Sequence, residues 1–303
     1  MYPLHARLIA MTEALGHAIV QTLSKLFAFL PFSCLDASFM QQALVSLLLL
    51  APLTAVMGVQ VVNLRMAFFS DAISHSAFAG VALGLILSLP PELSMPAFGL
   101  IIGLGIVAFL RHSTLSSDTV IGVFFSGAVA FGLAAISRYP EFSYSLNQFL
   151  YGDILAISET EVFWLAILLL CQIIFQLYGW NKLLYLSVSG LLAKVHRVHT
   201  AVWQYVFAAF LAAVVLFSVR AVGVLLVTAL LIVPAAAARN LAKSAGSMFW
   251  WAIGVSVVSS VTGLILSAQD WMRTATGATI ILVACFLFAI SALSVFTKGV
   301  RRI

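Results

Sequence analysis

Long apolar stretches separated by short polar gaps run through most of the chain. A bilayer core of about 30 Å needs about 20 apolar residues in a helix, so each stretch is read as a membrane span. The predicted spans cover residues 39–62, 66–89, 96–110, 118–136, 161–178, 201–217, 221–238, 247–268 and 277–296. The pattern predicts an all-α, polytopic membrane protein with about 8–9 transmembrane helices.

Composition supports this fold class. The chain is 63% hydrophobic and 8% charged, whereas a soluble domain carries about 25% charged residues. Its net charge of +5 does not indicate nucleic-acid binding, because the basic residues form no stripe and lie in the gaps between apolar runs. The cysteines Cys34, Cys171 and Cys285 form no CxxC pair, and we expect the last two to be buried packing groups without disulfides.

Residues 1–37 are more polar than the rest and form a predicted N-terminal extension. They lack the compact basic start and clean apolar core of a signal peptide, so we expect an amphipathic or poorly inserted helix ending near Pro31. Residues 38–303 are predicted to form one transmembrane domain. Within it, Pro52 and Pro234 are expected to kink or break their helices.

Small residues recur at every fourth position in several spans. This spacing lets helix backbones approach closely in a membrane. The stripes are Ser76, Gly80 and Gly84; Gly99 and Gly103; and Gly122 and Ser126.

Charge placement predicts an orientation. If the first span runs from outside to inside, basic residues are in excess on the cytoplasmic side, as the positive-inside rule requires. The basic residues then inside are Arg65, Arg111, Lys182, Lys194, Arg197, Arg239, Lys243, Lys298, Arg301 and Arg302, against Arg7, Lys25, Arg138, Arg220 and Arg273 outside. The protein is therefore expected in the cytoplasmic (inner) membrane with its C-terminus in the cytoplasm.

Asp71 and His75 are the candidate site, because they are ionisable residues within the apolar stretch 66–89. Their i, i+4 spacing places both on one helix face, and a charged group at membrane depth costs about 2.5–3.5 kcal/mol on insertion scales. For a helix beginning near Met66, His75 lies about 13 Å along the axis, close to mid-membrane. Carboxylate oxygen beside imidazole nitrogen suits zinc, manganese or iron. A hydrogen-bonded pair that only stabilises packing is the alternative.

Two segments between spans carry polar residues. Phe142–Ser158 is expected on the outer side, as a re-entrant, cavity-lining segment or as an ordinary loop. The cytoplasmic connection 179–200 carries a short apolar patch, Leu191–Ala193, among basic residues. It is either a solvated loop or a short amphipathic helix that docks into a groove on a cytoplasmic partner.

Four blocks of sequence resemble the permease family of bacterial ABC-type zinc, manganese and iron importers. Met66–Gly84, MAFFSDAISHSAFAGVALG, is similar to the family signature with its Asp-x-x-x-His pair. The other blocks are Asp118–Gly132 (DTVIGVFFSGAVAFG), Phe149–Ile157 (FLYGDILAI) and Val219–Ala242 (VRAVGVLLVTALLIVPAAAARNLA). The resemblance spans about residues 39–296 in consistent order. Ser70, Ala79 and His196 depart from the common family residues.

The resemblance implies the ABC importer permease fold and a transport subunit rather than an enzyme. It implies three partners: a cytoplasmic ABC ATPase, an extracytoplasmic metal-binding protein, and a second permease copy or homologous permease. It implies Asp71 and His75 as metal ligands and no permanently bound cofactor, the zinc, manganese or iron being cargo. Ser189, Leu191, Leu192, Ala193 and Lys194 fall where the family places its ATPase-coupling helix.

Two ligands are too few for a closed metal site, since structural zinc takes four. Ser74, Asn147 and Asp153 are the candidates to complete the shell. The chain has no Gly-x-x-x-x-Gly-Lys stretch, so ATP hydrolysis is expected on a separate chain. The main alternative is an ATP-independent, ion-coupled metal transporter or channel. A permease for large chelates and an intramembrane enzyme fit the ionisable pair less well.

Overall fold

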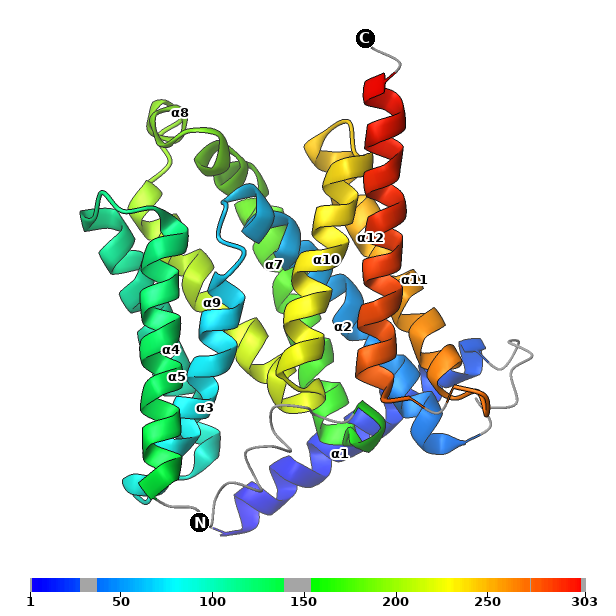
Figure 1. The fold of residues 1–303 in the computed structure, drawn as a ribbon. Coiled ribbons are helices and arrows are strands. Elements are labelled where there is room, and N and C mark those ends of the chain that lie inside the picture. The colour runs from blue at the N-terminus through cyan, green and yellow to red at the C-terminus, as the bar shows by residue number, and fades with distance from the viewer. Residues whose placement is uncertain (1, 28–36, 139–153, 273, 301–303) are drawn as a thin grey trace. The chain divides into compact units, whose positions relative to one another are not determined.

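The computed structural model describes residues 2–27, 37–138, 154–272 and 274–300, and within these ranges the chain is helical without strands. Every predicted span coincides with a long helix, which confirms the all-α fold (Figure 1). The helices are α1 (Tyr2–Phe27), α2 (Ser38–Asn63), α3 (Phe69–Ile86), α4 (Pro91–His112), α5 (Ser117–Arg138), α7 (Glu159–Val188), α8 (Gly190–Val195), α9 (Thr200–Val222), α10 (Val224–Leu241), α11 (Ala245–Ser267) and α12 (Thr276–Val300), with a 3-10 turn η3 (Ile154–Ala156).

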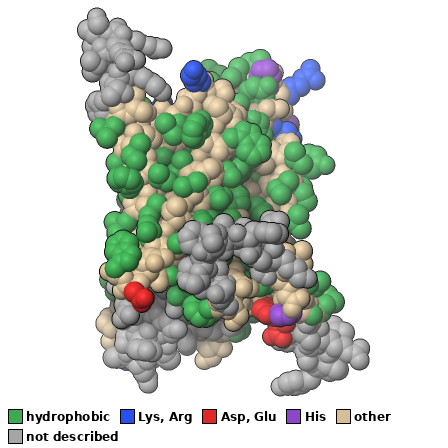
Figure 2. All heavy atoms as spheres, turned by 90° about the vertical axis from the view of Figure 1, so that its right-hand side faces the viewer, with side chains coloured by type: hydrophobic (Ala, Val, Ile, Leu, Met, Phe, Trp, Pro, Cys, Tyr) green, Lys and Arg blue, Asp and Glu red, His purple; other side chains and the backbone are tan. Residues whose placement is uncertain are grey.

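The described helices make a multi-pass membrane protein. In the described ranges, 8 helices are long and apolar enough to cross a membrane: α2, α4, α5, α7, α9, α10, α11 and α12. On the face shown in Figure 2, hydrophobic side chains extend along the helices, whereas charged side chains gather at the ends. This distribution is typical of a surface that meets lipid, because charges are costly within the hydrocarbon core.

The chain forms two compact units. One comprises residues 57–152 and 174–228, and α3 is its central helix, packed against α4, α5 and α9. The other comprises residues 1–56, 153–173 and 229–303, where α11 packs along α12. In this second unit α1 is tied to the start of α7, because His17 Nδ1 lies 2.7 Å from Glu159 Oε1.

Close helix packing depends on most of the predicted small-residue stripes. A Cβ atom added at Gly80 would lie 2.9 Å from the Met95 Cα, and one at Gly103 would lie 2.9 Å from the Ile73 side chain. These glycines therefore set how closely α3 and α4 approach. Within the described chain the stripe on α5 has no packing neighbour at Gly122, because a Cβ there would meet open space.

Two further expectations concern single residues. Of the two alternatives for Pro52 and Pro234, a break is excluded, since α2 and α10 continue through them, and a kink stays a prediction. Cys171 and Cys285 are free as predicted, but their side chains are exposed rather than buried. An apolar run in a membrane protein has a lipid-facing side that is apolar as well, so apolar neighbours do not imply burial within the protein.

Candidate metal site

The helix that carries Asp71 and His75 begins later than the apolar pattern predicts. After α2, Arg65 adopts a left-handed conformation with φ 56°. The Arg65 N–H donates to the Val62 carbonyl and the Met66 N–H to the Val61 carbonyl, which is the Schellman pattern that ends a helix. α3 then starts at Phe69 rather than near Met66, and His75 lies about 9 Å along it.

This start places Asp71 in the first turn of α3. The first N–H groups of a helix have no partner within it, and the positive end of the helix dipole favours a carboxylate there. The sequence predicted the shared face of Asp71 and His75 but not this position. The carboxylate therefore has electrostatic support from its own helix.

Asp71 and His75 are the open positions on the first turns of α3. From Phe69 to Gly80, every other residue is buried, while these two keep partial exposure. An i, i+4 pair with this exposure faces one common space. The remainder of this part of α3 is packed against α4, α5 and α9.

Neighbouring helices hold each member of the pair separately. The Thr228 side chain on α10 is a polar neighbour of the Asp71 carboxylate, and its hydroxyl donates to the Leu225 carbonyl at 3.4 Å. The His75 ring meets the Phe125 ring of α5 edge-on, with centroids 5.1 Å apart and planes at 90°. In the described part of the chain no ion pair joins Asp71 to His75, so the packing-pair alternative lacks its expected contact.

Of the predicted additional ligands, the structure describes Ser74. Ser74 is fully buried, and its hydroxyl has no partner among the described residues. Asn147 and Asp153 lie outside the described residues. Across the described ranges, no cluster of three or more His, Cys, Asp or Glu side chains could hold a metal. Among the described His, Cys, Asp and Glu side chains, Asp71 and His75 are therefore the two candidate ligands.

Sequence reasoning missed several buried amides within the apolar helices. Gln172 and Gln176 lie one turn apart on α7, and their amide atoms have no partner in the described structure. The side-chain oxygen of Gln60 on α2 is also buried and without a described partner. Such groups cost free energy unless water or a ligand satisfies them. A glutamine within an apolar run was the sequence signal that could have identified these buried amides.

The predicted coupling segment contains the short helix α8. Ser189 caps it, with its Oγ accepting a hydrogen bond from the Leu191 N–H at 3.2 Å. Ala193 is buried, whereas Leu191 is 74% exposed and Val195 79% exposed. Leu192 is half-buried and Lys194 exposed. α8 thus presents an exposed apolar patch, Leu191 and Val195, and is anchored through Ala193.

The connection is shorter than the predicted range 179–200. α7 continues to Val188, because its last turns still bury Leu183 and contact α9 through Trp203. The Lys182 ammonium lies 4.4 Å from the Trp203 ring centroid. Tyr185 at this end of α7 stacks on His196, with centroids 4.3 Å apart and an interplanar angle of 2°. These contacts fix α8 relative to α7.

The fold is that of a multi-pass helical membrane protein, with the ionisable residues Asp71 and His75 on α3 and the exposed short helix α8 between α7 and α9. The sequence profile of the ABC 3 transport family matches residues 36–295. The chain belongs to this family, which contains the permease subunits of zinc, manganese and iron importers. The resemblance seen in the sequence is thereby confirmed, and residues 1–35 lie outside the match.

Relatives and a solved structure agree with this assignment. The chain is 34% identical over 249 residues to the "High-affinity zinc uptake system membrane protein ZnuB" of Haemophilus influenzae, covering 82% of this chain and 95% of the relative. It is 30% identical over 262 residues to the "Manganese import system permease protein ScaB" of Streptococcus gordonii, covering 84% and 91%. The structure of PsaBC from Streptococcus pneumoniae in complex with Fab matches with a TM-score of 0.71 and 30% identity, covering 86% of this chain and 91% of that one.

Proposed function

We propose that this chain is the membrane-spanning subunit of an ATP-driven importer that carries a divalent transition metal ion, zinc, manganese or iron, across the cytoplasmic membrane. The observation that carries the proposal is the exposure pattern of α3, where Asp71 and His75 alone stay open between Phe69 and Gly80. Relatives named for zinc and for manganese transport support the choice of cargo.

Asp71 and His75 contact the ion in passing. Thr228 is a polar neighbour of the Asp71 carboxylate, whose two oxygens have lone pairs for a cation. His75 supplies one ring nitrogen, and Phe125 limits the rotation of its ring. Two protein ligands leave the rest of the shell to water, so the ion is held weakly enough to leave again.

Energy comes from a cytoplasmic ATPase that docks on α8. The exposed Leu191 and Val195 form the apolar contact, and a helix in a groove is a common docking mode. An extracytoplasmic protein delivers the metal, and a second permease copy or homologue completes the path. The orientation follows the positive-inside rule, with α8 and the C-terminus in the cytoplasm.

The metal role is tested by uptake in vesicles containing the assembled complex. Asp71→Asn and His75→Ala are each expected to lower uptake of zinc, manganese and iron at least about tenfold while assembly with the ATPase is retained. Asp118→Asn and His112→Ala are matched controls, because both side chains are exposed at helix ends. Normal uptake in both site variants would refute the metal role. Uptake driven by a proton gradient without ATP would instead support the ion-coupled alternative.

Docking is tested separately with Leu191→Asp and Val195→Asp. A charge in this exposed patch is expected to reduce ATPase binding and metal-stimulated ATP hydrolysis. These positions are more informative than Leu192, which is half-buried. Lys243→Asp is the control, since it places an acidic residue at another exposed position on the same predicted side. Unchanged assembly in both patch variants would show that α8 does not couple.

A further inference from the structure

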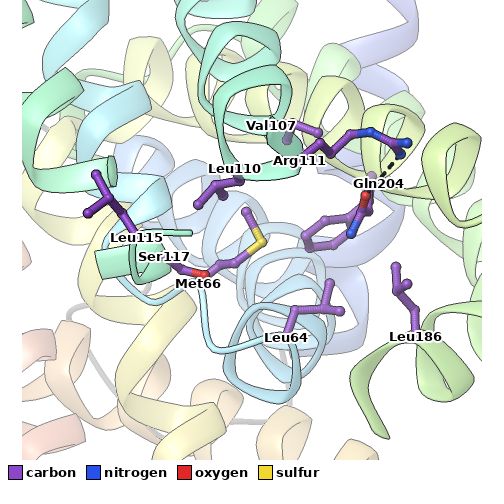
Figure 3. A pocket seen from close by; sticks show the side chains of 10 residues that line it. Leu64, Met66, Val107, Leu110, Arg111, Leu115, Ser117, Leu186 and Gln204 are labelled. Atoms are coloured by element: carbon purple, nitrogen blue, oxygen red, sulfur yellow. Dashed lines mark hydrogen bonds between the residues drawn. The ribbon is translucent and has the colours of Figure 1, made fainter. Parts of the chain in front are cut away.

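A cavity of about 240 Å³ lies at the end of the unit that contains α3. At about 30 Å³ for each water, it has room for roughly eight water molecules. Figure 3 shows lining side chains from the α2–α3 connection, the last turns of α4 and α7, the α4–α5 connection, and the starts of α5 and α9. The lining residues are Leu64, Met66, Val107, Leu110, Arg111, Leu115, Ser117, Leu186, Gln204 and Phe207.

The cavity combines an apolar wall with one cationic group on its rim. Of the side chains that line it, Arg111 alone carries a charge at neutral pH. Its Nη1 donates to the Gln204 Oε1 at 3.3 Å (Figure 3), and its guanidinium carbon lies 5.9 Å from the Tyr205 ring centroid. Guanidinium has five N–H donors in a fork that matches two phosphate oxygens. Gln204 and Tyr205 therefore hold the group in place while most of its donors can bind an anion.

Other charges near the rim also favour an anion. Arg65 lies between the lining residues Leu64 and Met66, and His112 follows Arg111; both are exposed. Ser117 begins α5, so the positive end of a helix of 22 residues is at the same wall. Asp118, the next residue, is exposed and opposes the anion. The two arginines outweigh this single carboxylate.

The position of the cavity matches the boundary between hydrocarbon and water. Arg111 is in the last turn of α4 and Ser117 in the first turn of α5, both candidate membrane spans. Basic pockets between helix ends are sites where anionic lipid headgroups bind. A metal cation is disfavoured by the guanidinium, and a small soluble anion would leave the leucine-rich wall uncovered. A phospholipid matches both the guanidinium, through its phosphate, and the leucine-rich wall, through its acyl chain.

We propose that this cavity binds an anionic phospholipid of the leaflet on the α8 side. The phosphodiester lies against Arg111, and the glycerol and the first methylenes of an acyl chain lie against Leu64, Leu110 and Leu115. The lipid thereby joins the ends of α2, α4, α5 and α9. This role is independent of the metal pair and of the cargo.

The test uses the purified complex in nanodiscs of equal parts phosphatidylglycerol and phosphatidylcholine, with retained lipid counted by native mass spectrometry. The wild-type complex is expected to retain phosphatidylglycerol in preference to phosphatidylcholine. Arg111→Gln is expected to lower that retention about tenfold, and Leu110→Trp to lower it by filling the cavity. Arg239→Gln is the matched control, because Arg239 is an exposed arginine at the end of α10 and does not line the cavity.

Three outcomes would overturn the proposal. The first is equal phosphatidylglycerol retention in the wild type and Arg111→Gln. The second is binding of inorganic phosphate or glycerophosphate to Arg111 with no retained lipid, which would identify a soluble anion site. The third is protection of Arg111 by the ATPase with no lipid in the cavity, which would assign the surface to protein docking. Arg111 is exposed, so its variant is expected to fold.

Discussion

Replacing Gly223 by alanine is expected to destabilise the protein and to impair transport. Gly223 alone separates α9 from α10, and its backbone angles are φ 87° and ψ 163°. This region of conformational space is essentially restricted to glycine, and another residue there costs about 1–3 kcal/mol. Alanine also lowers the conformational entropy of the unfolded chain, which offsets up to about 1 kcal/mol of this cost. The net loss is therefore about 1–2 kcal/mol.

Thermal unfolding in detergent measures this loss. A change of 1 kcal/mol shifts Tm by about 2–4 °C in a protein of 150–250 residues, so a fall of a few degrees is expected. Gly254→Ala is the matched control, because Gly254 lies within α11, is exposed, and a Cβ there would meet open space. That substitution is expected to raise stability by about 0.5–1 kcal/mol. The same chemical change thus has opposite signs at the two positions.

Transport is the second readout of this pair of variants. α10 begins at Val224, directly after Gly223, and carries Thr228, a polar neighbour of Asp71. A backbone shift at Gly223 is expected to move Thr228 and to lower metal uptake, whereas Gly254→Ala leaves uptake unchanged. If Gly223→Ala melts at or above the wild-type temperature, the backbone argument is wrong. If it melts lower but transports normally, the link to Asp71 is wrong.

Three further substitutions test local features by thermal unfolding. Arg197→Gly is expected to stabilise the end of α8 by about 1 kcal/mol, because Arg197 has φ 55°; a lower Tm would argue against it. Ser244→Ala removes the capping box at the start of α11 and should cost about 1 kcal/mol, so an unchanged Tm would contradict the cap. Gly263→Ala should be more damaging, because its Cβ would lie 2.5 Å from the Ile280 Cα; tolerance would show that α11 and α12 can separate.

Most of the fold was predictable because each membrane span must satisfy its backbone hydrogen bonds within itself. Apolar length therefore located the helices, and the errors concern their ends. α7 extends to Val188 because Leu183 is buried and Trp203 packs beside Gly179. α3 starts late because Arg65 ends α2 in a left-handed turn. Both effects depend on tertiary packing or local backbone geometry that hydropathy does not record.

The candidate site was predictable in its members but not in its surroundings. Spacing alone places Asp71 and His75 on one face. Phe125 and Thr228, which contact them, are distant in sequence and have ordinary roles in their own helices. At Gly122 the regular spacing predicted packing, and the described chain has open space there. Periodicity identifies a face of a helix but not the element that covers it.

The division of the chain into two units has a consequence for biosynthesis. The unit that carries Asp71 and His75 ends at Thr228, whereas the other unit joins residues 1–56 to residues 229–303. At about 5–20 residues per second, synthesis of residues 229–303 takes about 4–15 s. During that time the unit that contains Asp71 and His75 has all of its residues, whereas the other unit still lacks α11 and α12. The unit with the ionisable pair can therefore assemble first as the chain emerges from the ribosome.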